Sequence, residues 1–367
     1  MAECVLHIAV DGRELCGKPT GVGRYLSEIL RSWADDPGFA HRCTIVVPRE
    51  PPADLLPAGG RFTLDVAPAT AAGTVWEQTR LARRVRALAP DVLFAPGYTA
   101  PLWIDTPVVL TVHDVSFFAH PEWFSPREGR RRRWLTRASA RRARTVLTVS
   151  RFSADEITRW TGVARDRILV AGNGAPRVAT PPPSSPLDAR EPMVLFAGSL
   201  FTRRRIPDLL QGFAQVASPA GARLVLVGDN RTAPRIDPVA IAASLGLGDR
   251  VEWRAWVDDA ELHGLYGRAR AFAFLSDYEG FAIPPLEAIA YGVPPVLLDT
   301  PVAREVYAGA ALYVRPDPHA IAGALTTLLT DADVRRRLAA AGREALARHS
   351  WTRTARAVRE ALEAAAR

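Results

Sequence analysis

The chain has 367 residues, which is more than one ordinary core holds and suits two domains of roughly 100–200 residues each. Its 48% hydrophobic and 23% charged residues are typical of folded proteins, and they exclude disordered and collagen-like classes. The formal net charge of +8 comes almost wholly from arginine, because Lys18 is the only lysine. This charge is compatible with nucleic acid, an anionic membrane or a phosphorylated small molecule as partner, and does not choose among them.

The beginning of the sequence predicts a strand. Glu3 and Asp11 interrupt the apolar residues there, which is not the pattern of a signal peptide. No run of about 18 apolar residues predicts a membrane-spanning helix. Cys4, Cys16 and Cys43 are unclustered, so they indicate neither a disulfide framework nor a metal site and fit a reducing compartment. We therefore expect a cytoplasmic protein.

Short apolar or β-branched runs alternate with helical stretches in the first half of the chain. The predicted strands are 5–10, 44–47, 92–94, 108–112 and 146–149, and the predicted helices between them include 25–33, 76–88 and 130–143. Such alternation indicates a parallel sheet with helices on both faces.

The second half repeats this pattern. Its predicted strands are 193–197, 224–227, 251–253, 271–275 and 295–298, and a Pro-rich stretch separates the halves. We predict an α/β protein with an N-terminal Rossmann-like domain at 1–178, a linker at 179–186 and a C-terminal Rossmann-like domain at 187–351. The apolar pattern of the last helix, 352–367, is compatible with packing on either domain and does not choose between them. Ligands of open parallel sheets bind beyond the carboxyl ends of the strands, so two facing domains would form a central cleft.

Two acidic residues flank a glycine and two prolines after the strand at 271–275. Pro284 and Pro285 suit the first turn of a helix, which places Glu279 in the loop before it and Glu287 in its first turn. Gly280 lets the backbone approach a ligand closely. A helix N-terminus favours a phosphate, and a carboxylate accepts hydrogen bonds from a diol. The spacing fits equally well a solvated loop carboxylate and a partner of the helix dipole.

The string from residue 279 to 296, E-G-F-A-I-P-P-L-E-A-I-A-Y-G-V-P-P-V, resembles the E-x7-E signature of the retaining nucleotide-sugar glycosyltransferases of family 4. That pattern runs E-G-F-G-L-P-x-L-E-A-M-A-x-G-x-P-V in enzymes with the GT-B fold. Ala282 stands where the family has its second glycine, and we expect it to tighten the loop. The resemblance implies that Glu279 holds sugar hydroxyls, that Glu287 holds the ribose diol, and that Gly280, Phe281 and Ala282 approach the donor.

A basic cluster follows the first strand of the second half. Guanidinium groups can grip phosphate oxygens bidentately, although an exposed arginine-rich loop fits this composition as well. The segment resembles the G-S-L-x-x-R-K-N element of the family, whose basic pair contacts the donor diphosphate. The resemblance implies that Ser199, Arg203 and Arg204 meet the donor, with Arg205 at the position of the Asn. Which two arginines face the diphosphate stays open.

A glycine-rich stretch separates the first predicted strand from the first helix. A dinucleotide-binding fingerprint has a third glycine where Leu26 stands here, and its glycines directly follow the strand, whereas about ten residues separate them in this chain. A dehydrogenase is therefore disfavoured. The stretch resembles the T-G-x-G-R-Y opening of family members that build polysaccharides. The resemblance implies that Gly21 and Gly23 approach the donor phosphates and that Tyr25 lies on the acceptor side.

His113 and Asp114 end the predicted strand at 108–112, at the edge where a reacting group belongs in a parallel sheet. A lone histidine is more often structural. The pair resembles the H-D element of the family, which implies that His113 bonds a sugar hydroxyl near the reacting face and that Asp114 orients the acceptor side.

The resemblance implies transfer of a hexosyl group from a nucleoside diphosphate to a glycan or lipid-linked hydroxyl, with retention of configuration and GDP-mannose as the first candidate donor. His113, Glu279, Arg203 and Arg204 are then the catalytic candidates, since cationic groups stabilise the departing diphosphate. No D-x-D element lies at a predicted strand end and no His/Cys cluster occurs, so we expect no metal or other cofactor.

Two alternatives and one surface remain open. Sugar transfer to a small natural product fits the same motifs, and a basic nucleic-acid-binding protein fits the charge but lacks a reading motif. The arginine-rich stretch 130–144 is either a solvated helix or a basic surface that touches anionic lipid at the inner face of the plasma membrane.

Overall fold

The structure is a computed structural model, which describes residues 5–17, 21–57, 59–68, 73–176, 189–217 and 220–367. It consists of two compact units. The first comprises residues 1–174 and 350–367, and the second comprises residues 175–349. The C-terminal helix therefore belongs to the N-terminal unit, a choice that its sequence left open. The predicted linker, 179–186, lies outside the described residues.

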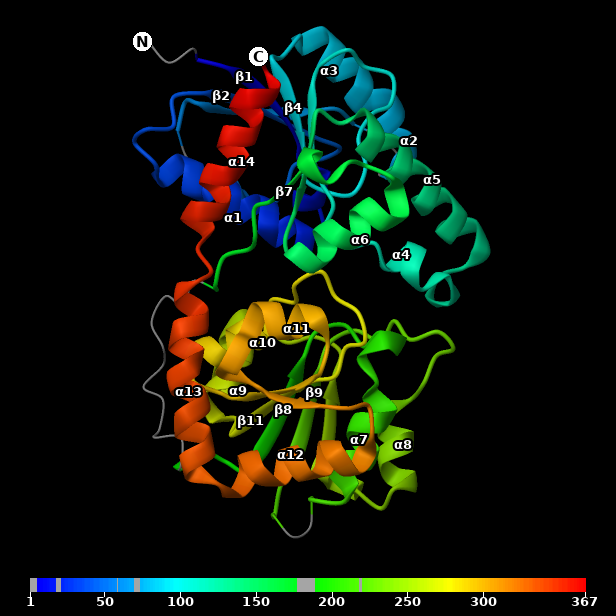
Figure 1. Cartoon of the computed structure of the whole chain (residues 1–367), viewed down its shortest axis with the longest axis vertical. Coiled ribbons are helices and arrows are strands. Elements are labelled where there is room, and N and C mark those ends of the chain that lie inside the picture. The colour runs from blue at the N-terminus through cyan, green and yellow to red at the C-terminus, as the bar shows by residue number, and fades with distance from the viewer. Residues whose placement is uncertain (1–4, 18–20, 58, 69–72, 177–188, 218–219) are drawn as a thin grey trace. The chain divides into compact units, whose positions relative to one another are not determined.

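The N-terminal unit is built on a parallel sheet of seven strands in the order β3-β2-β1-β4-β5-β6-β7 (Figure 1). The strands are β1 His7–Asp11, β2 Arg42–Val47, β3 Phe62–Val66, β4 Val92–Ala95, β5 Val108–Thr111, β6 Thr145–Thr148 and β7 Ile168–Val170. The sequence predicted five of them and missed β3 and β7, which are the two edges. Edge strands bury less of their surface, and Leu64, Val66 and Leu169 are at least a third exposed. Polar residues interrupt β3, and β7 is only three residues long.

Helices cover both faces of this sheet. They are α1 Gly21–Asp35, α2 Thr74–Trp76, α3 Ala82–Leu88, α4 Ser116–Ala119, α5 Pro126–Arg142, α6 Arg151–Thr161 and α14 Trp351–Ala365, and a π-helical turn over Glu77–Leu81 joins α2 to α3. The helix expected over 76–88 therefore exists, with a widened turn in it. Because side chains alternate along a strand, Ala9, Leu93 and Leu110 join one core with Trp76 and Phe117, on the face of α2, α3, α5 and α6.

The opposite face of the sheet is covered by α1 and α14. Trp33 of α1 packs on Phe94 of β4, with ring centroids 6.0 Å apart, and its indole N–H donates to the Ala355 carbonyl of α14 at 2.9 Å. Val358 and Leu362 are fully buried on the inner side of α14. The apolar stripe seen in the sequence of the last helix thus completes the N-terminal core. Figure 1 shows α14 beside α1.

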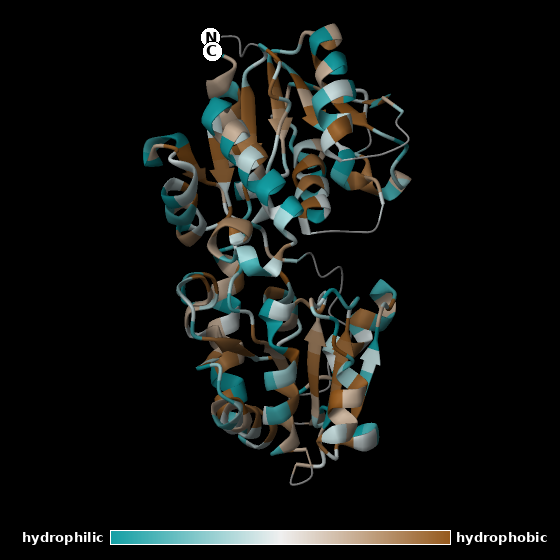
Figure 2. Cartoon of the chain, turned by 90° about the vertical axis from the view of Figure 1, so that its right-hand side faces the viewer, coloured by the Kyte–Doolittle hydropathy of each residue, from teal (hydrophilic) through white to brown (hydrophobic). Residues whose placement is uncertain are grey.

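The C-terminal unit has a parallel sheet of six strands in the order β10-β9-β8-β11-β12-β13. The strands are β8 Met193–Ala197, β9 Arg223–Val227, β10 Val251–Arg254, β11 Ala271–Phe274, β12 Pro295–Leu298 and β13 Leu312–Val314. The helices are α7 Ile206–Ala214, α8 Pro238–Ser244, α9 Asp259–Arg268, α10 Pro284–Ala290, α11 Pro301–Tyr307, α12 Pro318–Thr330 and α13 Ala332–Ala347. The sequence predicted every strand but β13, which is three residues long at the sheet edge. Figure 2 shows that apolar residues concentrate in the strands of both sheets.

Both sheets have the strand order of a doubly wound fold, with the first strand of each unit beside its fourth. β1 pairs with β4, and β8 pairs with β11. The connections leave such a pair in opposite directions, which opens a crevice beyond its carboxyl ends where ligands bind. The two crevices are therefore the places to look for a site.

Candidate functional site

The crevice of the C-terminal unit is lined by the two segments that carry the predicted donor residues. Ser199–Arg205 follows β8, and Ser276–Ala282 follows β11. The Asp277 backbone N–H donates to the Arg203 carbonyl at 2.9 Å, which ties the two segments together. The fold thus brings together residues such as Arg204 and Glu279, which lie 75 positions apart in the sequence.

Arg203, Arg204 and Glu279 form one cluster at this crevice. The nearest guanidinium nitrogens of Arg203 and Arg204 lie 3.6 Å and 3.2 Å from Glu279 Oε1. Ser276 Oγ donates to the same carboxylate oxygen at 3.0 Å. All three charged side chains are 10–15% exposed. Two cations around one carboxylate leave an excess positive charge, which is the charge that an anionic ligand needs.

Arg204 is the more deeply held of the two arginines. Its Nη1 donates to the Ser199 carbonyl at 2.7 Å, and its guanidinium lies 4.6 Å from the centroid of the Phe274 ring. Burial lowers the pKa of Arg204, and Glu279 opposes this shift. The predicted donor residue Ser199 therefore contributes its carbonyl to fixing Arg204.

Arg205 has a different environment. Its Nε donates to Asp277 at 2.7 Å and its Nη1 to Asp208 at 2.9 Å. Its backbone lies in the left-handed region, with φ 48° and ψ 44°, where Asn is enriched among residues other than Gly. Of the three adjacent arginines, Arg203 and Arg204 are thus the pair that meets Glu279, whereas Arg205 ties the loop to two aspartates.

The loop before α10 is strained and tightly held. Ala282 has φ 63°, a conformation that costs an L-residue about 1–2 kcal/mol and costs glycine little. The Tyr307 hydroxyl, which is buried, contacts the carbonyls of both Phe281 and Ala282. The expected tightening of the loop at Ala282 is therefore a left-handed turn, held from behind by a tyrosine that no sequence motif indicated.

Glu287 lies in the first turn of α10, as its spacing predicted. Tyr266 of α9 is buried and donates its hydroxyl to Glu287 Oε2 at 3.0 Å. Since Pro284 and Pro285 carry no N–H, the backbone donors near this helix start come from the preceding loop. Among the described residues, the Phe281 and Ala282 N–H groups have no protein acceptor.

The N-terminal unit holds the other predicted residues beyond the carboxyl end of β5. His113 Nε2 lies 2.8 Å from the Pro96 carbonyl, and burial lowers the pKa of His113. Asp114 accepts from the Tyr98 hydroxyl at 2.7 Å and from the Ser116 N–H at 2.8 Å. Tyr25 is 1% exposed and packs edge-on against His113, with ring centroids 4.8 Å apart. Its buried position supports His113 and does not present the hydroxyl at the surface.

Gly21 and Gly23 lie within the first turn of α1, where the sequence suggested a loop. Gly21 is exposed and Gly23 is buried. Neither has a positive φ, so they provide small side chains at a helix start and not a special turn. Residues 18–20 of the same stretch lie outside the described residues.

Sequence reasoning missed a buried ionic cluster beside these residues. Arg13 Nε lies 3.3 Å from Asp11 Oδ2, and Arg13 Nη1 forms an ion pair with Glu77. Glu77 is fully buried and Asp11 is 1% exposed, and burial raises the pKa of Asp11 to about 6. The Gly97 carbonyl and the Thr99 hydroxyl contact this cluster. Nothing in the spacing of these residues indicated that they meet.

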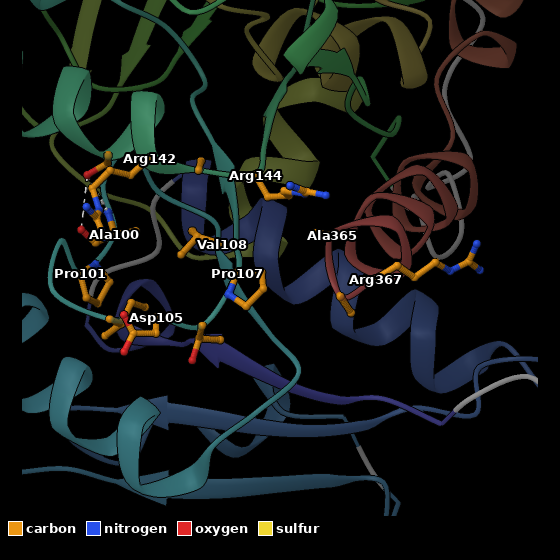
Figure 3. A pocket seen from close by; sticks show the side chains of 14 residues that line it. Ala100, Pro101, Asp105, Pro107, Val108, Arg142, Arg144, Ala365 and Arg367 are labelled. Atoms are coloured by element: carbon orange, nitrogen blue, oxygen red, sulfur yellow. Dashed lines mark hydrogen bonds between the residues drawn. The ribbon is translucent and has the colours of Figure 1, made fainter.

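Another hollow lies elsewhere in the N-terminal unit. It has a volume of about 480 Å³ and is lined by Pro107, Val108, Arg142 and Arg144 among others (Figure 3). Val108 begins β5, so this hollow lies at the amino edge of the sheet, opposite the edge that carries His113. A smaller hollow in the C-terminal unit is lined by Ser276, Glu279, Ala282 and Tyr307 and belongs to the predicted site. In the part of the chain that the structure describes, no helix has the length and apolar character needed to cross a membrane.

Comparisons with known proteins agree with this arrangement. Residues 180–345 match the family described as glycosyl transferases group 1, and residues 19–177 match glycosyltransferase family 4. The chain is 30% identical over 210 residues to "O-antigen chain mannosyltransferase RfbU" of Salmonella typhimurium, a match that covers 57% of this chain and 56% of the relative. It is 28% identical over 272 residues to "O-antigen chain mannosyltransferase B" of Escherichia coli, which covers 71% of each.

Solved structures of glycosyltransferases have a similar fold. The structure of Anabaena Alr3699/HepE in complex with UDP and glucose superposes with a TM-score of 0.75 at 20% identity, over 98% of this chain and 100% of that one. The matched stretch spans only about half of the RfbU relative. The two family models together account for nearly the whole chain, and each unit has the sheet of a GT-B glycosyltransferase. The chain belongs to glycosyltransferase family 4.

Proposed function

We propose that the chain is a retaining hexosyltransferase that moves a sugar, with mannose as first candidate, from a nucleoside diphosphate to a hydroxyl of a glycan or lipid-linked glycan. The observation that carries this proposal is the Arg203–Arg204–Glu279 cluster at the crevice between β8 and β11. A leaving diphosphate gains negative charge as its bond to the sugar breaks. Two nearly buried guanidinium groups stabilise that charge without reorganising.

The acidic residues divide the donor between them. Glu279 is held by both arginines and by Ser276, and we assign it to the sugar hydroxyls beside the diphosphate. Glu287 has one oxygen oriented by Tyr266, and its carboxylate is the acceptor for a ribose diol. The Phe281 and Ala282 N–H groups add backbone donors for phosphate oxygens.

The reaction is proposed to keep the anomeric configuration. In line with the family resemblance, we favour attack by the acceptor hydroxyl on the face that the diphosphate leaves. The departing phosphate oxygen then takes the hydroxyl proton. The anomeric proton signal of the product, measured by NMR, distinguishes retention from inversion.

A panel of nucleotide sugars tests the donor. GDP-mannose is expected to raise the unfolding temperature most, in line with the mannosyltransferase relatives, and UDP-glucose, UDP-galactose and the free diphosphates complete the panel. Stabilisation by none of them would contradict the proposal. Activity that survives exhaustive chelation is expected if no metal is required, and loss of activity restored by a divalent cation would refute that part.

Glu287→Ala tests the ribose assignment. A hydrogen bond to a charged group contributes about 1.5–3 kcal/mol, so the variant is expected to bind the nucleotide sugar about 10–100-fold more weakly by calorimetry. The exposed Glu344 on α13 provides a matched control, Glu344→Ala, with unchanged affinity. Equal affinity of wild type and Glu287→Ala would remove Glu287 from the donor site.

We also propose that α5 contacts anionic lipid, which fits a lipid-linked acceptor. Arg130, Arg131 and Arg132 are exposed on this helix, and Trp134 beside them is 63% exposed. Cationic and aromatic side chains on one helix are the composition of an interfacial surface. Sedimentation with anionic vesicles is expected to weaken in Trp134→Ala and to stay unchanged in Trp256→Ala, which changes a more exposed tryptophan of the other unit. Absence of salt-sensitive binding by the wild type would end this proposal.

A further inference from the structure

The segment Pro96–Thr99, which follows β4, contacts four of the polar side chains described above, namely those of Arg13, Glu77, His113 and Asp114. The Pro96 carbonyl lies 2.8 Å from His113 Nε2, and the Tyr98 hydroxyl donates to Asp114 at 2.7 Å. The Gly97 carbonyl accepts from Arg13 Nη2 at 3.3 Å, and the Thr99 hydroxyl donates to Glu77 Oε2 at 2.6 Å. Four consecutive residues thus join the buried ion pair to the predicted His-Asp element.

The buried ion pair of Arg13 and Glu77 holds the Gly97 and Thr99 end of this segment. Arg13 lies between Asp11 at the end of β1 and Glu77 in the π-helical turn, and both carboxylates are buried. A buried ion pair is weak evidence for stability, because desolvation offsets its attraction, and its best-supported use is to specify geometry. A π-helical turn inside an α-helix is also found frequently at functional positions. The cluster occupies the crevice between β1 and β4, where a doubly wound unit has its functional edge.

The contact to Pro96 determines the protonation of the histidine ring. A carbonyl oxygen only accepts hydrogen bonds, so Nε2 carries the proton. Burial lowers the pKa of the ring and so favours its neutral form, in which Nδ1 is an unprotonated acceptor. Among the described residues none donates to Nδ1. Tyr25 packs edge-on against the ring at 4.8 Å and Tyr98 at 5.6 Å, which limits its rotation.

We propose that the Pro96–Thr99 segment, clamped by the Arg13–Glu77 pair, fixes the orientation and the Nε2–H tautomer of His113, so that Nδ1 accepts a hydrogen bond from a hydroxyl of the transferred sugar or of the acceptor. Arg13, Glu77 and Tyr98 are thereby positioning residues. This inference rests on the proposed function for the contact between His113 and substrate, whereas the control of the tautomer stands independently of it.

Two variants test the inference at different contacts of the segment. Glu77→Gln keeps the size of the side chain and removes the charge that holds Arg13, and Tyr98→Phe removes the hydroxyl bonded to Asp114. Misplacement of a reacting group by a fraction of an ångström lowers turnover, so kcat is expected to fall about 10–100-fold. Affinity for the nucleoside diphosphate, measured by calorimetry, is expected to stay unchanged because its proposed ligands lie in the other unit. The partly exposed Glu128, which is paired with Arg132 on α5, provides the control Glu128→Gln with unchanged kcat.

Long-range ¹H–¹⁵N spectra of histidine-labelled protein read the tautomer directly. The chain has seven histidines, so the signal of His113 is assigned by its loss in His113→Gln. The wild type is expected to show the Nε2–H tautomer alone, and both variants a mixture of tautomers. The titrating groups that face the His113 ring are Asp114, Tyr25 and Tyr98. In both variants we expect the low-pH limb of the profile of kcat against pH to move.

The outcomes separate the inference from the proposed function. If wild type transfers sugar but both variants keep its kcat and its single tautomer, the inference is overturned and the function stands. If wild type turns over no nucleotide sugar, the function fails and the spectra alone decide: a mixture in the variants supports the positioning role, and an unchanged tautomer refutes it. If Glu77→Gln does not fold by circular dichroism, Tyr98→Phe carries the test.

Discussion

Replacing Asp11 by Asn is expected to change how the stability of the N-terminal unit depends on pH. Asp11 is 1% exposed at the end of β1, and burial raises its pKa from 3.8 to about 6, against the attraction of Arg13. Between about pH 4 and pH 6 the folded unit therefore keeps a proton that the unfolded chain has released. The folded state binds more protons in this window, so the free energy of unfolding falls as the pH rises through it.

The magnitude follows from the size of the shift. A difference of about two pKa units corresponds to about 3 kcal/mol, at 1.36 kcal/mol for each unit. Relative to Asp11→Asn, which has no titrating group at this position, the wild type is expected to lose about this much stability between pH 4 and pH 7. The attraction between Arg13 and the ionised carboxylate is already contained in the pKa of Asp11, so it is part of this pH-dependent difference and needs no separate correction.

Urea unfolding followed by tryptophan fluorescence measures this difference, since Trp33 and Trp76 of the same unit are each 1% exposed. The exposed Asp299 provides a control of opposite sign. Its hydrogen bond to Arg304 lowers its pKa, so the wild type loses stability relative to Asp299→Asn as the pH falls. A difference between wild type and Asp11→Asn that stays constant from pH 4 to pH 7 would refute the assignment of a raised pKa to Asp11.

Two further variants test the packing on which the site depends. Ala282→Gly relieves the strain of a left-handed backbone in the folded state, and the greater freedom of glycine in the unfolded chain offsets part of this gain. The variant is expected to stabilise the C-terminal unit by up to about 1 kcal/mol in urea unfolding. Destabilisation would show that the loop is not strained. Leu362→Ala removes a fully buried side chain of α14 and is expected to cost about 2–5 kcal/mol. Because α14 belongs to the N-terminal unit, only the unfolding transition of that unit is expected to move, which also identifies this transition for the Asp11 experiment; a shift of the other transition would contradict this placement.

The central strands and the donor motif were predictable because their causes are local. Strands such as Met193–Ala197 and Pro295–Leu298 are buried on both faces and read as continuous apolar runs, and the structure has them at the predicted bounds. Glu287 falls in the first turn of α10 because prolines are tolerated there. The edge strands β3, β7 and β13 escaped prediction because they are short or half-exposed and depend on a neighbour to form.

The sequence by itself determined that the chain has two α/β units. It also determined that Glu279 lies in a loop and Glu287 in the helix that follows, and the E-x7-E string indicated glycosyltransferase family 4. Only the tertiary structure decided that Arg203 and Arg204, and not Arg205, meet Glu279, and that α14 packs against the N-terminal sheet. It also brought Asp11, Arg13 and Glu77 together. The physical reason is that propensity and periodicity act over a few residues, whereas ion pairs and hydrogen bonds join groups whose separation in the chain carries no signal.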